Sequence, residues 1–425
     1  MASKKISNYK RKKSLIKKQL GGILNTEQLA ILGNRNELSL DKYVILSCRE
    51  FEPLAQSLVS RSPSLFIKGN VTWTKYPDGT PKMFLDEYTV KMLRGRHIIY
   101  LAYFSFNEPN STNILSQYML LSSLASYGIN KLHIILPYYP TGTMERIQIE
   151  GELGTGYYLA HFFNSIPCGN SKNELYVIDM HALCTRFFFH TNVKMTFVTM
   201  FAKYVQIINA NPGPSFVVFP DDGAEKRNKQ LCEINKVKFI TCAKKRDKDE
   251  RTIQITGSLT EVISTAHTNL QKLRKSEKID NINLFIMDDL IQTGGTAGTT
   301  ILELNDALKT KLNEQLVKDT VLNDEEWSQL IKYKLLITHS ILPVTDSTEP
   351  TITSVKSIFI EKLNFNSIPN LDFVTTDTRP NMANMLTQIN TEEGLLKGRI
   401  TVISIDDILL SIFTDINTPY ITPFK

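Results

Sequence analysis

Short apolar runs recur along the chain from about residue 40 and alternate with segments long enough to form helices. The runs that we expect to form strands are residues 42–48, 97–104, 131–139, 175–180, 215–220, 237–242, 282–287, 334–342, 357–363, 373–378 and 400–404. Apolar side chains at consecutive positions are typical of strands buried on both faces. Such strands, separated by helices, form βαβ units. The pattern predicts an α/β fold with mainly parallel sheets covered by helices, and polar stretches 266–281 and 312–328 as surface insertions.

The length and composition fit a globular protein. A chain of 425 residues has room for two or three domains of ordinary size. No apolar run approaches the roughly 18 residues expected of a membrane span, so we expect a soluble protein with no membrane partner. The five cysteines form no CxxC pair, which argues against a zinc site or a disulfide framework and favours a reducing compartment.

The positive charge is concentrated at the N-terminus. The net charge is +6, and the stretch KKISNYKRKKSLIKK holds eight Lys or Arg and no acidic residue. The remaining body is close to neutral, so we expect no nucleic-acid partner. We interpret residues 1–34 as a basic, disordered tail, while a nuclear signal, a membrane-surface anchor or an organelle address stays open.

The segment LFIMDDLIQTGGTAGTT, residues 284–300, joins a strand-like run to two aspartates and a glycine–threonine loop. In α/β sheets, ligands bind beyond the carboxyl ends of strands. Small residues let backbone N–H groups converge on an anion, and Thr293 and Thr296 add hydroxyl donors. Asp288 and Asp289 would repel a phosphate unless they accept from sugar hydroxyls or bind a cation. The segment predicts a sugar-phosphate site; the alternative is that TGG is a plain turn and the two aspartates are a helix cap.

This pattern resembles the phosphoribosyl-diphosphate (PRPP) loop of type I phosphoribosyltransferases and of PRPP synthetases. Other segments favour the synthetases: ILPYYPTGTMERIQIEGE is similar to their ATP-binding loop and CAKKRDKDER to their catalytic loop. VIDMHALCTRFFFH, VVFPDDGAEKR and WTKYPDGTPKMF also match, in family order over roughly residues 40–405. The variants PTGTxER and PDDGAxKR look most like the plant-type class II branch.

The resemblance implies ribose-phosphate diphosphokinase activity, in which the diphosphoryl group of ATP, or of another nucleotide, is transferred to C1 of ribose 5-phosphate. Mg²⁺ is the implied cofactor, and PRPP and AMP are the products. The site residues that it implies are catalytic Lys244, Arg246 and His181; nucleotide-binding Tyr76, Asp78, Glu145 and Arg146; metal-binding His181 and Asp221; and, for ribose 5-phosphate, Asp288, Asp289, Thr293, Gly294, Gly295 and Thr296. We assign no general base.

The resemblance also implies two tandem phosphoribosyltransferase-like domains, residues 35–194 and 195–394, with the nucleotide between them. Residues 395–425, the final strand and helix, are expected to return to the first domain. A homo-oligomer is expected, because the loop KYPDG reaches nucleotide bound mainly by a neighbouring subunit in the family. The expected location is cytoplasmic, with organellar or nuclear targeting left open.

Several positions depart from the common family pattern. Thr143 and Met144 replace Arg and Gln, Glu145 replaces Asp, Thr80 replaces Glu, and Gln292 replaces an acidic residue. Met144, Thr80 and Gln292 leave open a non-catalytic synthetase-like regulatory subunit. A type I phosphoribosyltransferase stays a further alternative because it shares the loop with two aspartates and TGGT.

Taken singly, the proposed catalytic residues also have structural explanations. His181 fits a core histidine, and Lys244 and Arg246 fit a solvated face. All three are present in family order, which favours an enzyme.

Overall fold

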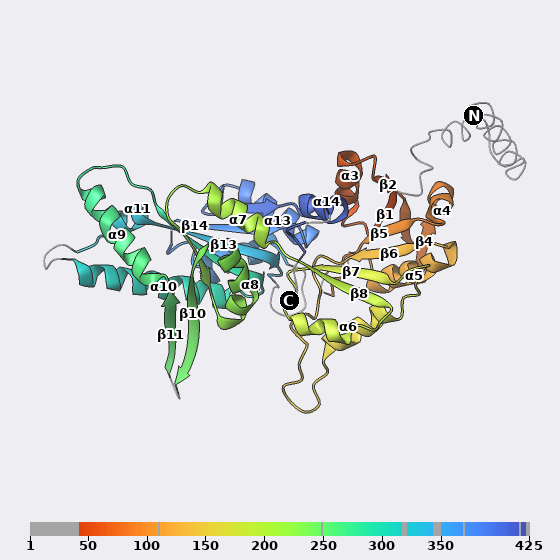
Figure 1. Ribbon diagram of the computed structural model, residues 1–425, viewed down its shortest axis with the longest axis horizontal. Helices are drawn as coiled ribbons and strands as arrows, with labels where there is room; N and C mark the ends of the chain where they lie inside the picture. The colour runs from red at the N-terminus through yellow and green to blue at the C-terminus, as the bar shows by residue number, and fades with distance from the viewer. Residues whose placement is uncertain are drawn as a thin grey trace, which may run out of the picture.

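The computed structural model describes residues 42–421, apart from 107, 109–110, 248–249, 317–320, 343–349, 369 and 416–417. The side chains of residues 243–254 also fall outside the description, as does the basic tail, whose role stays a prediction. The described chain folds into two α/β lobes that lie side by side (Figure 1). Each lobe contains one main sheet, so the expected α/β class with mainly parallel sheets is confirmed.

The first lobe is built on a six-stranded parallel sheet with the strand order β2-β1-β5-β6-β7-β8. Its strands are β1 (Tyr43–Ser47), β2 (Phe66–Lys68), β5 (His97–Leu101), β6 (Lys131–Ile135), β7 (Asn173–Ile178) and β8 (Val193–Val198). A separate hairpin joins β3 (Val71–Lys75) to β4 (Pro81–Leu85). The helices are α3 (Glu52–Arg61), α4 (Glu87–Leu93), α5 (Ile114–Leu124), η1 (Ala125–Tyr127), α6 (Thr155–Asn164) and η2 (Leu183–Phe188).

The second lobe is built on a seven-stranded sheet with the order β11-β10-β9-β12-β13-β14-β15, in which only β10 and β11 pair antiparallel. Its strands are β9 (Ser215–Phe219), β10 (Lys238–Asp247), β11 (Glu250–Gly257), β12 (Ile282–Ile291), β13 (Ile331–Ser340), β14 (Leu371–Thr376) and β15 (Ile400–Ile403). The helices are α7 (Phe201–Ala210), α8 (Asp222–Ile234), α9 (Leu259–Arg274), α10 (Gly295–Gln315), α11 (Asp324–Leu330), α12 (Ile352–Ser357), η3 (Ile358–Lys362) and α13 (Pro380–Thr391). The last helix, α14 (Asp406–Thr414), packs against the first lobe.

The lobes share a hydrophobic core. One cluster of buried residues joins Ile45 and Ile99 of the first sheet to Phe219 and Phe285 of the second. Burial of apolar surface on both sides of the junction stabilises one arrangement of the lobes. No helix within the described part of the chain is both long and apolar enough to cross a bilayer.

Three expectations from the sequence need correction. The apolar run 357–363 is helical, because it completes α12 and forms η3. The stretch 266–281 is largely the second half of α9, and 312–328 contains the end of α10 and part of α11. Trp327 of α11 is only 6% exposed, so α11 packs against the core.

The third correction concerns the last strand, which was expected beside the first sheet. Strand β15 pairs in parallel with β14 and forms an edge of the second sheet. The helix that follows, α14, does contact α3 of the first lobe, where Arg61 pairs with Asp406 at 2.8 Å and with Asp407 at 2.6 Å. The chain therefore leaves the second lobe only after β15. The domain boundaries expected at 194 and 394 stay predictions.

Candidate active site

The two adjacent aspartates lie on β12, near the carboxyl end of a central strand of the second sheet. The strand continues beyond them to Ile291, so the acid pair is part of the strand and does not follow it. The Asp288 side chain is 18% exposed and that of Asp289 only 5%. Burying two neighbouring carboxylates is costly unless cations or donors compensate them. Two residues from other elements supply that compensation.

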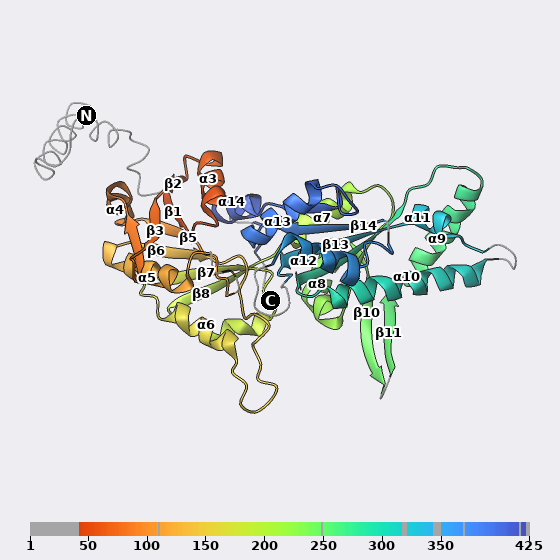
Figure 2. The ribbon, with the colours of Figure 1, turned by 180° about the vertical axis from the view of Figure 1, so that it is seen from behind.

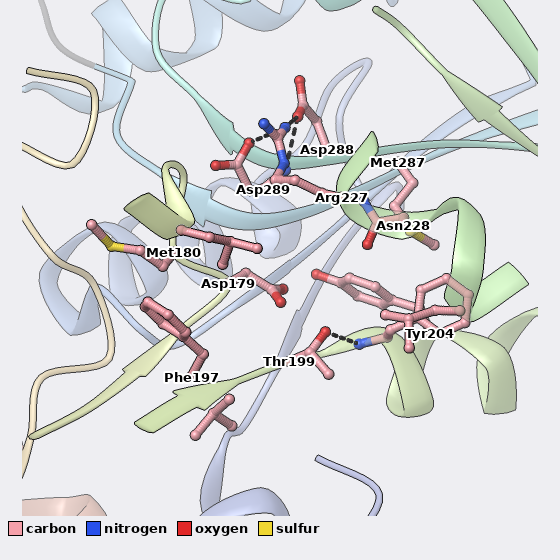
Figure 3. Close-up of a pocket in the computed structure, with 14 residues that line it drawn as sticks. Asp179, Met180, Phe197, Thr199, Tyr204, Arg227, Asn228, Met287, Asp288 and Asp289 are labelled. Carbon is pink, nitrogen blue, oxygen red and sulfur yellow. Dashed lines mark hydrogen bonds and ion pairs between the residues drawn. The ribbon is translucent and has the colours of Figure 1, made fainter. Parts of the chain in front are cut away.

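Arg227 of α8 compensates both acids. Its Nη2 atom lies 2.7 Å from Asp288 Oδ1 and 2.7 Å from Asp289 Oδ1, and Figure 3 shows the guanidinium between the two carboxylates. The Nε atom of Arg227 is buried and has no hydrogen-bond partner within the described part of the chain. Burial raises the pKa of Asp288, and the charge of Asp289 raises it further. The guanidinium is therefore needed to keep the pair in the sheet.

His181 compensates Asp289 from the first lobe. It follows β7, and its Nδ1 atom donates a hydrogen bond of 2.7 Å to Asp289 Oδ2. Burial alone would raise the pKa of Asp289, but the His181 hydrogen bond and the Arg227 charge hold it well below its usual range. This contact joins the predicted metal-site histidine to the predicted sugar site across the lobe junction.

Two more contacts fix the segment before His181 to the second lobe. His339 Nε2 donates to the carbonyl oxygen of Ile178 at 2.9 Å, and Thr338 Oγ1 donates to Asp179 Oδ2 at 2.5 Å. Burial raises the pKa of Asp179 to about 6. The backbone φ of Asp179 is +37°, a region that few side chains other than Asp and Asn adopt. This bend directs the chain toward the carboxyl end of β12.

The predicted phosphate loop connects β12 to α10. Gly294 has a φ of +78° and is the N-cap of α10, so the helix begins without a side-chain cap. The first N–H groups of a helix lack partners within the helix and attract anions. Thr293 and Thr296 flank this turn and are exposed. Close packing fixes the helix start, because a Cβ at Gly298 would lie 1.7 Å from the carbonyl oxygen of Lys362.

A cavity of about 50 Å³ lies between the lobes beside the acid pair (Figure 3). Asp179, Thr199 and Tyr204 line one side, and Arg227 and the two aspartates line the other. A smaller adjoining cavity is lined by residues of the predicted ATP-binding loop together with the predicted metal ligand: Tyr138, Gly142, Thr143 and His181. The predicted nucleotide loop and sugar site therefore share one junction.

Comparison with known proteins shows which family this chain resembles. The spinach protein named ribose-phosphate pyrophosphokinase 3, mitochondrial, is 29% identical over 279 residues, which cover 64% of this chain and 61% of that protein. Rice ribose-phosphate pyrophosphokinase 4 is 29% identical over 252 residues, covering 59% of this chain and 69% of that protein. This chain is a relative of the ribose-phosphate pyrophosphokinases. The match to plant members confirms the plant-type resemblance.

The likeness extends to the fold. A crystal structure of phosphoribosylpyrophosphate synthetase from Mycobacterium smegmatis matches with a TM-score of 0.59 and 15% identity, over 88% of this chain and 97% of that one. No protein-family model matches the sequence. The alignments span about 61% of the spinach pyrophosphokinase and 69% of the rice one. The relationship therefore shows the fold and the family likeness, and the activity is taken up below as a proposal.

The residues implied for nucleotide binding are dispersed. Arg146 is 79% exposed and pairs with Glu145 at 3.2 Å, beyond the part of the loop that lines the junction. Tyr76, 50% exposed, and Asp78, which accepts from Thr80 N at 2.9 Å, occupy the turn between β3 and β4. Figure 2 shows this hairpin in the first lobe, away from the second sheet. Their roles as nucleotide ligands stay predictions.

The two implied catalytic cations lie on a hairpin and not on a loop. Lys244 and Arg246 belong to β10, opposite Ile253 and Arg251 of β11. The hairpin projects from the second lobe in Figure 1. The side chains lie outside the description, so their approach to the site stays a prediction. The regular ladder corrects the expectation of a free loop.

Asp221 and His181 stay the predicted protein ligands of a magnesium site. Asp221 is the N-cap of α8 and accepts from Ala224 N at 2.8 Å, and His181 keeps its Nε2 atom outside the contact with Asp289. Among the described residues, no three His, Cys, Asp or Glu side chains gather as a metal cage. Magnesium at a nucleotide site takes most of its ligands from phosphate oxygens and water, so two protein ligands match its needs.

Sequence reasoning missed the contacts made by Arg227, Asp179 and Thr338. Arg227 stands in the segment VVFPDDGAEKR, where a basic residue close behind two acids was a local signal. Asp179 and Thr338 gave no signal, because residues 159 positions apart meet only through the packing of the lobes. A buried strand end with two acids demands a nearby cation, which is the signal that could have identified Arg227.

Proposed function

We propose that the chain is a ribose-phosphate pyrophosphokinase, which transfers the diphosphoryl group of ATP to the C1 hydroxyl of ribose 5-phosphate and gives PRPP and AMP. The observation that carries the proposal is the contact between His181 and Asp289, since it joins a nucleotide-side segment to the sugar-side acid pair. The named relatives support the same reaction. The reaction needs both substrates held in line, and a junction between two lobes provides such a place.

Ribose 5-phosphate fits the end of β12 and the start of α10. The N–H groups after Gly294 and the hydroxyls of Thr293 and Thr296 suit the 5-phosphate. The acid pair on β12 suits the sugar hydroxyls, because carboxylates accept strong hydrogen bonds from them. A sugar phosphate satisfies both halves of the segment at once.

The nucleotide phosphates fit the opposite side of the junction. His181 and Asp221 would hold Mg²⁺, which when bound neutralises phosphate charge. The His181 ring is oriented by Asp289, and Asp221 is oriented by the start of α8. Lys244 and Arg246 would bind the β- and γ-phosphates from the β10–β11 hairpin, where fixed positive charge stabilises the transferring group.

The proposal includes assembly and location. A homo-oligomer would let the exposed turn with Tyr76 and Asp78 reach nucleotide in a neighbouring subunit. The five cysteines are all free, which supports a reducing compartment such as the cytoplasm. The printed name of the spinach relative includes the word mitochondrial, so an organelle is the alternative location for this chain.

The test is product formation by the purified chain with ribose 5-phosphate, Mg²⁺ and each nucleoside triphosphate in turn. PRPP and AMP are quantified by chromatography. We expect both products with ATP, and their loss in His181→Ala but not in the exposed control His190→Ala. Folded protein that binds ribose 5-phosphate but forms no PRPP with any nucleotide would overturn the proposal and favour a regulatory subunit. Consumption of added PRPP with a nucleobase would indicate a phosphoribosyltransferase.

A further inference from the structure

The two adjacent aspartates differ in what their oxygens already hold. Both carboxylate oxygens of Asp289 are engaged: Oδ1 by Arg227 and Oδ2 by His181, each at 2.7 Å. Asp288 accepts from Arg227 and from the backbone N–H of Asp289 through the same Oδ1 atom. Asp288 Oδ2 takes part in neither of these two hydrogen bonds. Of the pair, only Asp288 has a carboxylate oxygen outside these contacts.

The two aspartates also differ in how far their side chains are exposed. The Asp289 side chain is 5% exposed, against 18% for Asp288, although they are neighbours on one strand. Arg227 Nη2 contacts both carboxylates, so the difference lies in the second partner of each: the His181 ring for Asp289, and the backbone N–H of Asp289 for Asp288. Asp289 lies at the lobe junction and Asp288 lies nearer the solvent. A sugar hydroxyl reaches Asp288 without breaking an existing contact.

We propose that Asp289 is a positioning residue, which orients His181 and Arg227 across the lobe junction, and that Asp288 is the aspartate that accepts the sugar hydroxyls. The inference rests on the proposed function and divides the roles within the same site.

The orientation of His181 has a chemical consequence. An ionised carboxylate only accepts hydrogen bonds, so His181 must carry its proton on Nδ1 when it contacts Asp289. The Nε2 atom, which lies outside the contact with Asp289, then carries the lone pair through which an imidazole can bind a metal. Most free histidines carry the proton on Nε2 instead. Asp289 therefore selects the form of His181 that can bind a metal.

The contact also makes this selection depend on the packing of the lobes. The three consecutive attachments of the segment before η2 are Ile178 to His339, Asp179 to Thr338, and His181 to Asp289. The first two fix the backbone, and the third fixes the imidazole ring. If the lobes separate, all three contacts break together, and His181 loses its orientation. Asp289 therefore orients the His181 ring only when the two lobes are packed against each other.

Substitution of either aspartate by asparagine removes the same charge from the same strand, so the two variants are matched. In Asp289→Asn, the single amide oxygen can accept from only one of the two donors, His181 Nδ1 or Arg227 Nη2. The NH₂ group then faces the other donor, with which it forms no hydrogen bond. We expect kcat to fall roughly 10–100-fold, as for other residues that orient a metal ligand, with the KM for ribose 5-phosphate changed less than about threefold. In Asp288→Asn, we expect the KM to rise roughly tenfold or more.

A spectrum of the wild-type protein tests the proposal without a variant. With seven histidines in the chain, ¹⁵N-histidine labelling and long-range ¹H–¹⁵N correlation at pH 8 resolve each ring, and His181→Gln identifies the signal of His181. The proposal expects the Nδ1–H form in wild type and its loss in Asp289→Asn. An Nε2–H form in the wild type would overturn it.

Two further measurements complete the experiment. Calorimetry with ribose 5-phosphate should give similar affinities for wild type and Asp289→Asn, and weaker binding for Asp288→Asn. Equal loss of affinity in both variants would overturn the division of roles. The double variant His181→Ala with Asp289→Asn should be no slower than His181→Ala alone. If wild type forms no PRPP, the proposed function fails, while the spectrum and the calorimetry still decide the role of Asp289.

Discussion

Arg379, the residue before α13 in the second lobe, donates through Nη2 to Oε1 of Glu108 in the first lobe at 2.8 Å. Their side chains are 4% and 9% exposed, so the ion pair is removed from water. Tyr103 donates to the same carboxylate oxygen at 2.6 Å, and the Arg379 guanidinium lies over the Tyr138 ring at 5.5 Å. A second buried contact between the lobes therefore lies near the loop that leads to the nucleotide side.

Removing one partner of this pair should destabilise the protein strongly. Glu108→Ala leaves a buried guanidinium without its anion, which costs about 3–5 kcal/mol. The matched control is Glu393→Ala, which removes an 88% exposed partner of Lys397 and should cost less than about 1 kcal/mol. Thermal melting measures both. A Glu108→Ala variant that melts within a degree of wild type would contradict the buried pair.

The start of α10 should tolerate no added atom at Gly298. A Cβ there would lie 1.7 Å from the carbonyl oxygen of Lys362, and neither backbone can move without shifting α10 or η3. We expect Gly298→Ala to cost about 3 kcal/mol or more through overpacking. Thr299→Ala, the next and exposed position, should be neutral or slightly stabilising because alanine favours helix. Equal melting temperatures for the two variants would refute the close approach.

Most strands could be predicted from the sequence, because strands buried on both faces appear as apolar runs that need no knowledge of the rest of the chain. The run 357–363 misled for the same reason: seven mostly apolar residues fit a buried strand or one face of a helix equally well. The capping box of Thr351 and Ser354, six residues earlier, was the local signal for a helix there. The edge position of β15 depends on tertiary pairing and had no local signal.

The candidate site also has parts that could be predicted from the sequence and parts that depend on tertiary packing. The acid pair and the glycine–threonine loop could be predicted, since one continuous segment carries both. Arg227 and His181 reach Asp289 across 62 and 108 positions of sequence. Such contacts form only when the sheets pack, so the sequence identified His181 and the two aspartates but missed Arg227 and the contacts that join them.

Lys244 should affect rate more than substrate binding. It lies on the projecting β10–β11 hairpin, and its proposed role is to stabilise charge on the transferring group. We expect Lys244→Ala to lower kcat by roughly 10²–10³-fold, with the KM for ribose 5-phosphate changed less than about threefold. Lys272→Ala, on the exposed face of α9, serves as the control and should keep full activity. Steady-state PRPP formation measures both, and a variant that loses only affinity would argue against the rate role.

His133 gives the first lobe a pH-dependent stability. Its side chain is buried in β6, with Nε2 3.0 Å from His97 Nδ1 and Nδ1 3.3 Å from the Tyr176 hydroxyl. Burial, together with the nearby charge of Lys131, lowers the pKa of His133 to about 3. Burial also lowers the pKa of His97. Folding therefore keeps an imidazole neutral at pH values where an unfolded chain would protonate it.

The sign follows from proton binding. An unfolded histidine protonates as the pH falls through about 6.5, whereas His133 stays neutral in the folded state down to about pH 3. As the pH falls, the unfolded state gains protons first, so the free energy of unfolding decreases. The decrease is up to about 1.4 kcal/mol per pH unit for His133. Glu174, whose pKa is lowered to about 2, adds a loss in the same direction only below about pH 4.5. Asp179, whose pKa is raised to about 6, protonates first in the folded state and so opposes this loss between pH 5 and 6.5; comparison with a His133 variant therefore isolates the share of His133.

Near pH 8, His133→Gln should melt lower than wild type, because the hydrogen bonds of His133 are disrupted. Between pH 5 and 6.5, the variant should lose less stability per pH unit than wild type. The exposed His190→Gln variant is the matched control and should keep the wild-type slope. The comparison rests on slopes and not on absolute stability, so a destabilised variant remains informative. A His133→Gln protein that keeps the full wild-type slope would show that the acid sensitivity arises elsewhere in the fold.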